Sequence, residues 1–308
     1  MSSPRLLVSI PDGRLREALG TPSPGVEFLE WDMTVPSPVD AIEIVVVPYL
    51  QANMRLSRLT GVRTRLVQGQ SAGFDGVEPL LPPGVVYANA ASVHETSTSE
   101  LALALILASQ RAIPDFVRSS DARRWAPRWA PSLADRTVLI VGYGAIGRAI
   151  ASRLLAFETT LLRVARTARF DDYGPVYPMT TLFDLLPRAD VVIVCVPLTE
   201  ATTHLIDDRF LSALRDGSLV VNVARGPVAD TSALVSHART GRLRFALDVT
   251  DPEPLPDDHP LFNLANVLIS PHVGGASSAM TPRMARLVRA QITRIGNGEP
   301  PLNVVLRT

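Results

Sequence analysis

The segment VLIVGYGAIGRAIASRL at residues 138–154 constrains the fold more than any other part of the sequence. It places Gly142, Gly144 and Gly147 in a G-x-G-x-x-G spacing, between an apolar run typical of a buried strand and an amphipathic run typical of a helix. The first glycine allows a tight turn, the second lets a pyrophosphate approach the main chain, and the third allows close helix packing. This context predicts a dinucleotide-binding βα unit, and a turn in some other α/β fold is the alternative.

Further apolar runs place this unit in a larger sheet. After residue 137 they are unbroken, which indicates a parallel sheet covered on both faces, and they read TVLIVG, TTLLRVA, VVIVCVP, SLVVNVA, RFALDV and VLISPH. The first 92 residues carry shorter runs, which predict a separate α/β unit: RLLVSI, VEFLEWD, AIEIVVV, TRLVQ and VVYAN. A helix is expected over STSELALALILASQR, capped by Ser97 or Ser99, and the C-terminal tail is expected to pack on the first unit.

Composition excludes several classes of function. The 30 basic and 30 acidic residues balance, so we expect neither nucleic acid nor an anionic membrane as a partner. All 30 basic residues are arginine, which leaves no lysine for a Schiff base. The single cysteine, Cys195, lies in an apolar run, and no histidine shows ligand spacing, so no metal site is expected. The N-terminal apolar stretch is too short for a signal sequence, so we expect a cytoplasmic protein.

The residues after the second strand of the glycine-rich unit address cofactor choice. An NAD site normally carries an acid about 20 residues beyond the glycines, which binds the adenosine ribose. Here Ala165 takes that position, followed by Arg166, Thr167 and Arg169. Arginines bind a 2′-phosphate well, and without a carboxylate at position 165 no negative charge repels that phosphate. NADP(H) is therefore predicted as the preferred cofactor, and NAD(H) stays possible. The alternative is a solvated basic loop without selectivity.

Three stretches place polar groups at the ends of predicted strands: VNVARGPV, ALDVTDPEPL and ISPHVGG. They supply Arg225, Asp248 with Glu253, and His272, and ligands bind at the carboxyl ends of open parallel sheets. An anion-binding arginine, a carboxylate and a titratable imidazole suit ketone reduction beside a nicotinamide. Each residue also has an ordinary structural alternative when taken alone.

These residues, in this order after the glycine-rich unit, closely resemble the D-2-hydroxyacid dehydrogenase family. The supporting stretches are QGQSAGFD at 68–75, TSELALAL at 98–105 and CVPLTEAT at 195–202. The resemblance implies an α/β fold: a Rossmann-type doubly wound parallel sheet over 94–276, inserted into a flavodoxin-like α/β substrate domain formed by 1–93 and 277–308. It also implies an NAD(P)-dependent enzyme that interconverts a small 2-keto acid and its 2-hydroxy acid, most similar to glyoxylate or hydroxypyruvate reductases.

The resemblance also implies roles for individual residues. Arg225 would hold the substrate carboxylate, His272 would give the proton, and Glu253 would stabilise the protonated ring, favouring reduction at neutral or lower pH. Asp248 would bond the nicotinamide carboxamide, and the amides near Ala72 and Gly73 would cradle the substrate with Arg225 and His272. The implied cofactor-binding residues are Gly142, Tyr143, Gly144, Ala145, Ile146, Gly147, Ala165, Arg166, Thr167, Arg169, Val196, Pro197, Thr202, Ala224, Arg225, Asp248, His272 and Gly274.

Two alternatives to this function stay open, two related activities are disfavoured, and one partner is expected. The same fold serves as a nucleotide-sensing corepressor, and a short phosphoglycerate dehydrogenase is a second possibility. Glu253 argues against formate oxidation, and Ala72, where phosphite dehydrogenases carry lysine, argues against phosphite. A homodimer is expected, with residues 96–130, including Trp125 and Trp129, as its contact.

Overall fold

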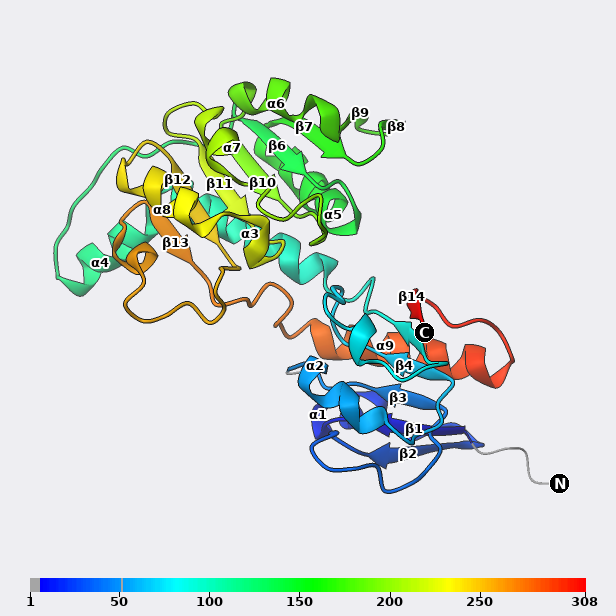
Figure 1. Cartoon of the computed structure of the whole chain (residues 1–308). Coiled ribbons are helices and arrows are strands. Elements are labelled where there is room, and N and C mark those ends of the chain that lie inside the picture. Colours follow the sequence, from blue (N-terminus) through cyan, green and yellow to red (C-terminus); the bar gives the residue numbers. More distant parts are fainter. Residues whose placement is uncertain (1–5, 51) are drawn as a thin grey trace. The chain divides into compact units, whose positions relative to one another are not determined.

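The computed structural model describes residues 6–50 and 52–308, and its contacts divide the chain into two compact units. Unit 1 comprises Met1–His94 with Gly275–Thr308, and unit 2 comprises Glu95–Gly274. Each unit is built on its own sheet with helices against both faces (Figure 1). The predicted α/β fold is therefore confirmed.

Unit 2 contains an eight-stranded sheet in the order β13-β12-β11-β10-β6-β7-β9-β8. All neighbouring pairs from β13 to β9 are parallel, and only the edge strand β8 runs antiparallel to β9. The strands are β6 (Thr137–Val141), β7 (Thr160–Ala165), β8 (Arg169–Asp171), β9 (Gly174–Pro178), β10 (Val191–Val194), β11 (Leu219–Asn222), β12 (Arg244–Leu247) and β13 (Val267–Ile269).

Buried side chains cover both faces of this sheet, as its unbroken apolar strands require. Helices α3 and α5 pack on one face, and α6, α7 and α8 pack on the other. The helices of unit 2 are α3 (Glu95–Gln110), α4 (Ile113–Asp121), α5 (Ala145–Leu154), α6 (Leu182–Leu185), α7 (Asp208–Ser212) and α8 (Thr231–Arg239).

Unit 1 contains a six-stranded sheet in the order β14-β5-β4-β3-β1-β2, in which only β14 is antiparallel. The order 2-1-3-4-5 of the parallel strands is that of flavodoxin-like sheets. Its elements are β1 (Leu6–Ile10), α1 (Gly13–Leu19), β2 (Val26–Glu30), β3 (Ile44–Val46), α2 (Ala52–Arg55), β4 (Leu66–Gln68), β5 (Val86–Ala88), α9 (Met280–Gly296) and β14 (Val304–Arg307).

Two local features differ from the sequence prediction. Helix α3 begins at Glu95, so Ser97 and Ser99 lie inside the helix, and the prediction that one of them caps it is wrong. The antiparallel hairpin of β8 and β9 was not predicted, because GPVYP carries two prolines and lacks an apolar run. Such a sequence is tolerated near the edge of a sheet, where fewer backbone N–H groups need a partner.

Within the described parts of the chain, the structure contains no helix that is both long enough and apolar enough to cross a membrane.

Candidate active site

The predicted site residues of unit 2 follow the carboxyl ends of its parallel strands. The glycine-rich loop follows β6, Arg166 follows β7, and Val196 follows β10. Arg225 follows β11, and His272 follows β13, which lies beside β12 in the sheet. Because parallel strands end at the same edge, the structure gathers these residues along one edge of the sheet, where open α/β sheets bind ligands.

The glycine-rich loop has a geometry that only glycine permits at two positions. Gly142 has φ +103°, and a Cβ there would lie 2.7 Å from the backbone carbon of Cys195. A Cβ on Gly147 would lie 2.3 Å from the carbonyl oxygen of Gly142. Gly144 instead precedes α5 and faces open space, because a Cβ there would meet no atom within 4 Å. A pyrophosphate could therefore approach the first turn of the helix at Gly144.

The loop is tied to β7, the strand that ends at the predicted adenosine ribose site. The N–H groups of Gly142 and Tyr143 both donate to the carbonyl oxygen of Val164, at 2.9 and 3.0 Å. Ala165 is buried at the end of β7, whereas Arg166, Thr167 and Arg169 are exposed. The guanidinium of Arg169 donates to the carbonyl oxygen of Tyr143 at 2.6 Å, so a cation lies against the glycine-rich loop.

The chain after β10 packs under the same loop. The thiol of Cys195 donates to the carbonyl oxygen of Gly142 at 3.0 Å, and Val196 is buried beside it. The hydroxyl of Thr202 closes the following turn by donating to the carbonyl oxygen of Pro197 at 2.7 Å. Desolvation of the sulfur raises the pKa of Cys195 to about 12, so this cysteine stays protonated and acts as a packing group.

The structure brings His272 and Glu253 together, 19 residues apart in sequence. Nδ1 of His272 lies 2.5 Å from a carboxylate oxygen of Glu253, and both side chains are about half exposed. Nε2 of the imidazole has no hydrogen-bond partner within residues 6–50 and 52–308. A carboxylate on one ring nitrogen orients the ring and leaves the other nitrogen for a substrate.

Asp248 organises the loop that carries His272. Its buried carboxylate accepts hydrogen bonds from the Ser270 hydroxyl at 2.6 Å and from the N–H groups of Val273 and Gly274, both at 2.9 Å. The carbonyl oxygen of Asp248 also accepts from the N–H of His272 at 2.7 Å. Asp248 thus has a structural role that the sequence did not predict, and it fixes the backbone on both sides of His272.

Arg225 lies in a loop that a buried asparagine holds in place. The side chain of Asn222 accepts from the N–H of Ala224 at 3.0 Å and donates to the carbonyl oxygen of Arg225 at 3.2 Å. A Cβ on Gly226 would lie 1.8 Å from the carbonyl oxygen of Thr250, so the loops after β11 and β12 are in close contact. Sequence reasoning missed Asn222 and Ser270, although a polar residue at the end of an apolar strand was an available signal.

The other predicted substrate residues, Ala72 and Gly73, lie in unit 1, after β4. The Asn89 amide donates to the carbonyl oxygen of Ala72 at 2.7 Å, which holds this loop. A pocket of about 520 Å³ lies at the carboxyl ends of β1, β3 and β4, lined by residues that include Arg14, Tyr49 and Gln70. It lies at the β1/β3 reversal of strand order, where flavodoxin-like sheets bind ligands.

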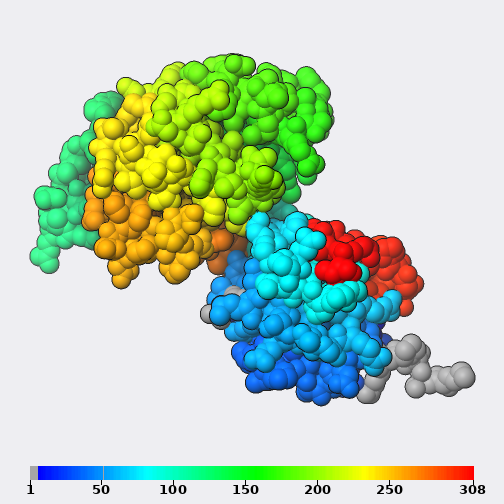
Figure 2. Space-filling model, in the orientation of Figure 1, coloured from blue at the N-terminus to red at the C-terminus, as the bar shows by residue number. Residues whose placement is uncertain are grey.

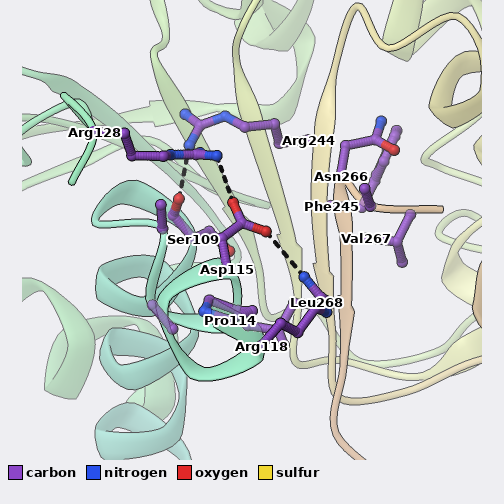
Figure 3. A pocket seen from close by; sticks show the side chains of 13 residues that line it. Ser109, Pro114, Asp115, Arg118, Arg128, Arg244, Phe245, Asn266, Val267 and Leu268 are labelled. Atoms are coloured by element: carbon purple, nitrogen blue, oxygen red, sulfur yellow. Dashed lines mark hydrogen bonds and ion pairs between the residues drawn. The ribbon is translucent and has the colours of Figure 1, made fainter. Parts of the chain in front are cut away.

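A second pocket, of about 330 Å³, lies in unit 2 at the amino-terminal ends of β12 and β13 (Figure 3). These are the strand ends opposite to those that carry the predicted site residues. Asp115 forms ion pairs there with Arg128 at 2.7 Å and Arg118 at 3.0 Å. Burial, together with the charge of Arg136, lowers the pKa of Arg244 in its wall. Because ligands of open α/β sheets bind at the carboxyl ends of the strands, this pocket at the amino-terminal ends is not part of the nucleotide site.

Comparison with known proteins identifies the class of this fold and site. Residues 103–274 match the family model described as D-isomer specific 2-hydroxyacid dehydrogenase, NAD binding domain. The glyoxylate reductase of Pyrococcus horikoshii is 34% identical over 258 residues, covering 80% of this chain and 77% of that protein.

Two solved structures carry the comparison over nearly the whole chain. A D-isomer specific 2-hydroxyacid dehydrogenase from Xanthobacter autotrophicus, in complex with NADPH and MES, is similar with a TM-score of 0.81 and 27% identity, covering 99% of this chain and 98% of that one. An NADPH-dependent glyoxylate/hydroxypyruvate reductase from Sinorhizobium meliloti, in complex with NADP and malonate, has a TM-score of 0.80 and 27% identity, covering 100% and 99%.

The chain belongs to the D-isomer specific 2-hydroxyacid dehydrogenase family. It is an NAD(P)-dependent oxidoreductase, as the sequence predicted.

Proposed function

We propose that this enzyme is an NADPH-preferring reductase of small 2-keto acids of the glyoxylate and hydroxypyruvate type. The observation that carries the proposal is the 2.5 Å contact between His272 and Glu253, at the sheet edge that also carries the glycine-rich loop. An oriented imidazole beside a nucleotide site is what a carbonyl reductase requires. The names of the Pyrococcus and Sinorhizobium relatives support the substrate class.

The proposed mechanism assigns one task to each of three residues. Arg225 binds the substrate carboxylate, and its positive charge polarises the neighbouring carbonyl. His272, when protonated, donates the proton on Nε2 to the carbonyl oxygen, while Glu253 keeps its hydrogen bond to Nδ1 and stabilises the imidazolium. The chemistry that the cofactor supplies when bound is a hydride for C2. In the reverse direction, neutral His272 takes the proton from the hydroxyl group.

The remaining site residues complete the proposal. The backbone of Ala72 and Gly73 would cradle the substrate carboxylate, and Asp248, besides bracing the His272 loop, would meet the nicotinamide carboxamide. The open face of Gly144 and the first turn of α5 would hold the pyrophosphate. The rest of the proposed cofactor contacts are those inferred from the sequence: Gly142, Tyr143, Ala145, Ile146, Gly147, Val196, Pro197, Thr202, Ala224 and Gly274.

The preference for NADP(H) rests on charge at the end of β7. No acid occupies the position of Ala165, and two exposed cations, Arg166 and Arg169, follow it. A phosphate gains charge-assisted hydrogen bonds from such arginines, whereas the 2′-hydroxyl of NADH would meet no carboxylate. The bound NADPH and NADP in the Xanthobacter and Sinorhizobium relatives agree with this assignment.

A homodimer is part of the proposal. The expected contact over 96–130 is corrected to α4 with the segment that follows it, because the apolar side chains of α3 are already buried in the core of unit 2. Trp125 and Trp129 are 97% and 102% exposed, and Val117 of α4 is 53% exposed. In Figure 2 this teal segment projects at the edge of unit 2. Indole rings are seldom left in water, and a second copy of the chain would cover them. A cytoplasmic location is also proposed, on the sequence expectation alone.

A corepressor that senses nucleotides is the competing function. It would need the glycine-rich loop but not an imidazole oriented by a carboxylate, so the His272–Glu253 contact favours the enzyme. A short phosphoglycerate dehydrogenase would differ only in its substrate.

Initial rates of NADPH and NADH oxidation with glyoxylate, hydroxypyruvate, pyruvate and phosphohydroxypyruvate test the proposal. We expect glyoxylate and hydroxypyruvate to be reduced with higher kcat/KM, and NADPH to be preferred. The variant that combines Ala165→Asp with Arg166→Ala should shift the preference toward NADH. An unchanged cofactor ratio in this variant would refute the cofactor assignment, and a preference for phosphohydroxypyruvate would refute the substrate assignment.

A further inference from the structure

A buried arginine, Arg163, connects the nucleotide loop to the unpredicted hairpin. Its side chain is 2% exposed and projects from the middle of β7. The adjacent residues on the other face, Leu162 and Val164, belong to one apolar cluster, and Ala165 on the Arg163 face belongs to the other. Packing alone would place an apolar side chain here, so the presence of a guanidinium requires another explanation.

The partners of Arg163 lie in both elements. Its guanidinium forms a 2.7 Å ion pair with Asp171 at the end of β8 and donates to the carbonyl oxygens of Tyr173 and Pro175 in the hairpin. It also donates to the Tyr143 hydroxyl at 3.4 Å and lies 5.2 Å from the centre of that ring. One side chain thus holds the hairpin turn and the residue between the first two glycines of the nucleotide loop.

The turn itself is shaped around this arginine. Gly174 has φ +99°, and a Cβ there would lie 3.4 Å from the guanidinium of Arg163. Asp171 also accepts from the N–H of Tyr173 at 3.0 Å. Desolvation raises the pKa of Asp171, but the hydrogen bonds from Tyr173 and Arg163 outweigh it, and the net pKa is below the usual value, so this carboxylate is charged at neutral pH.

The hairpin carries Arg169, one of the two arginines proposed to bind the 2′-phosphate. Arg169 begins β8, donates to the Tyr143 carbonyl oxygen at 2.6 Å and lies 5.6 Å from the centre of the Tyr143 ring. Both guanidinium groups therefore contact the same tyrosine. Strand β9 is paired with β7 in the sheet, whereas β8 is tied to β7 through the ion pair of Asp171 with Arg163. Loss of that ion pair would loosen β8 and the turn, and Arg169 at the start of β8 would lose its fixed position at the loop.

We propose that Arg163 is a positioning residue for cofactor selectivity, which fixes the β8–β9 hairpin and Tyr143 so that Arg169 faces the 2′-phosphate of NADP(H). This inference rests on the proposed preference for NADP(H). Arg163 itself is buried and does not touch the phosphate. A buried charge network of this kind selects one conformation at some cost in stability, and here the conformation selected is that of the phosphate-binding hairpin.

The test measures binding by titration calorimetry of the full chain with 2′,5′-ADP and 5′-AMP, which probe the 2′-phosphate without any turnover. Arg163→Met keeps an unbranched, apolar stem in the buried position and removes the charged guanidinium. We expect this variant to bind 2′,5′-ADP about tenfold more weakly, which corresponds to the loss of one charge-assisted hydrogen bond between Arg169 and the 2′-phosphate. Its affinity for 5′-AMP should be nearly unchanged. Arg163→Lys should restore part of the loss. Arg215→Met, which removes an exposed arginine paired with Asp190, is the matched control and should change neither affinity.

A double-mutant cycle with Arg169→Met identifies the route of the effect. If Arg163 acts through Arg169, then Arg163→Met weakens 2′,5′-ADP no further in the Arg169→Met background. Fully additive losses, or an unchanged 2′,5′-ADP preference in Arg163→Met, would overturn the inference. If Arg163→Met does not fold, Asp171→Asn decides, and it should weaken 2′,5′-ADP selectively. A wild-type protein that binds both nucleotides equally would instead refute the proposed NADP(H) preference itself.

Discussion

Nδ1 of His272 lies 2.5 Å from the carboxylate of Glu253, and this contact joins the loop after β13 to the loop after β12. The Asp248 carboxylate holds the His272 loop from the other side, through the N–H groups of Val273 and Gly274. The imidazole is therefore oriented both by its own hydrogen bond and by the backbone that carries it.

Replacing Glu253 with Gln should lower kcat for keto acid reduction by about ten- to a hundredfold, because the imidazolium loses its counter-charge. KM should change little, since Glu253 is not proposed to touch the substrate. Steady-state kinetics with glyoxylate measure both quantities, and Glu299→Gln, in unit 1, is the control. A large rise in KM at constant kcat would contradict a role for Glu253 in proton transfer.

Alanine at two glycines of the nucleotide loop should separate stability from nucleotide binding. Gly142→Ala places a Cβ 2.7 Å from the backbone of Cys195 at positive φ, so we expect the free energy of unfolding to fall by roughly 2–5 kcal/mol. Gly144→Ala meets no atom within 4 Å, so stability should be unchanged while nucleotide binding is lost. Urea unfolding measures the stability of both variants, and titration with NADPH, which carries the pyrophosphate, measures their nucleotide binding. Tight nucleotide binding by Gly144→Ala would show that the pyrophosphate lies elsewhere.

The thiol of Cys195 should resist alkylation in the native protein. Burial raises its pKa to about 12, so almost no thiolate exists at pH 8, whereas the unfolded chain exposes an ordinary thiol. Mass spectrometry after iodoacetamide treatment at pH 8 should find modification only in urea. Because the native pKa is the higher one, the stability that burial of the neutral thiol provides is complete below pH 8 and is lost as the pH rises toward 12. Rapid labelling of the native protein would contradict the desolvated, hydrogen-bonded position of the sulfur beside Gly142.

Sedimentation should show a dimer of the wild-type chain and a monomer of the Trp125→Ser, Trp129→Ser double variant. The two indoles are almost fully exposed within one chain, so their burial in a contact should supply much of its apolar area. Phe262→Ser, which changes an exposed aromatic residue outside this segment, is the control. A monomeric wild type at micromolar concentration would remove the dimer from the proposal.

The sequence was sufficient to predict the parallel sheet of unit 2, because strands buried on both faces are unbroken apolar runs and the G-x-G-x-x-G spacing fixes where β6 ends. For unit 1 the shorter runs predicted an α/β unit, and the resemblance implied its flavodoxin-like sheet. It was not sufficient for the β8–β9 hairpin, whose prolines and charges carry no strand period. The signal there is Arg163, a charge inside the apolar run TTLLRVA, which indicates a buried partner still to be found.

For the site, strand ends predicted which residues share one edge of the sheet, but not which of them touch. Asp248 illustrates the limit. Its position after β12 suggested a ligand contact, which remains part of the proposal, but did not indicate that its oxygens also accept hydrogen bonds from the Ser270 hydroxyl and two backbone N–H groups. Every residue except proline has a backbone N–H group, so the sequence does not indicate which of these groups bind Asp248. Only the structure shows these hydrogen bonds. The start of α3 at Glu95 was missed for a similar reason, since a preferred capping residue does not decide where tertiary contacts begin a helix.

The most direct test of the central claim compares wild type with His272→Gln, measuring glyoxylate-dependent NADPH oxidation and, in parallel, NADPH binding by fluorescence. The account predicts that the variant binds NADPH nearly as well as wild type and loses a factor of about 10² to 10⁴ in kcat, the contribution of a positioned general acid. Undiminished turnover in the variant, or a wild type that binds NADPH tightly and reduces no 2-keto acid, would contradict it.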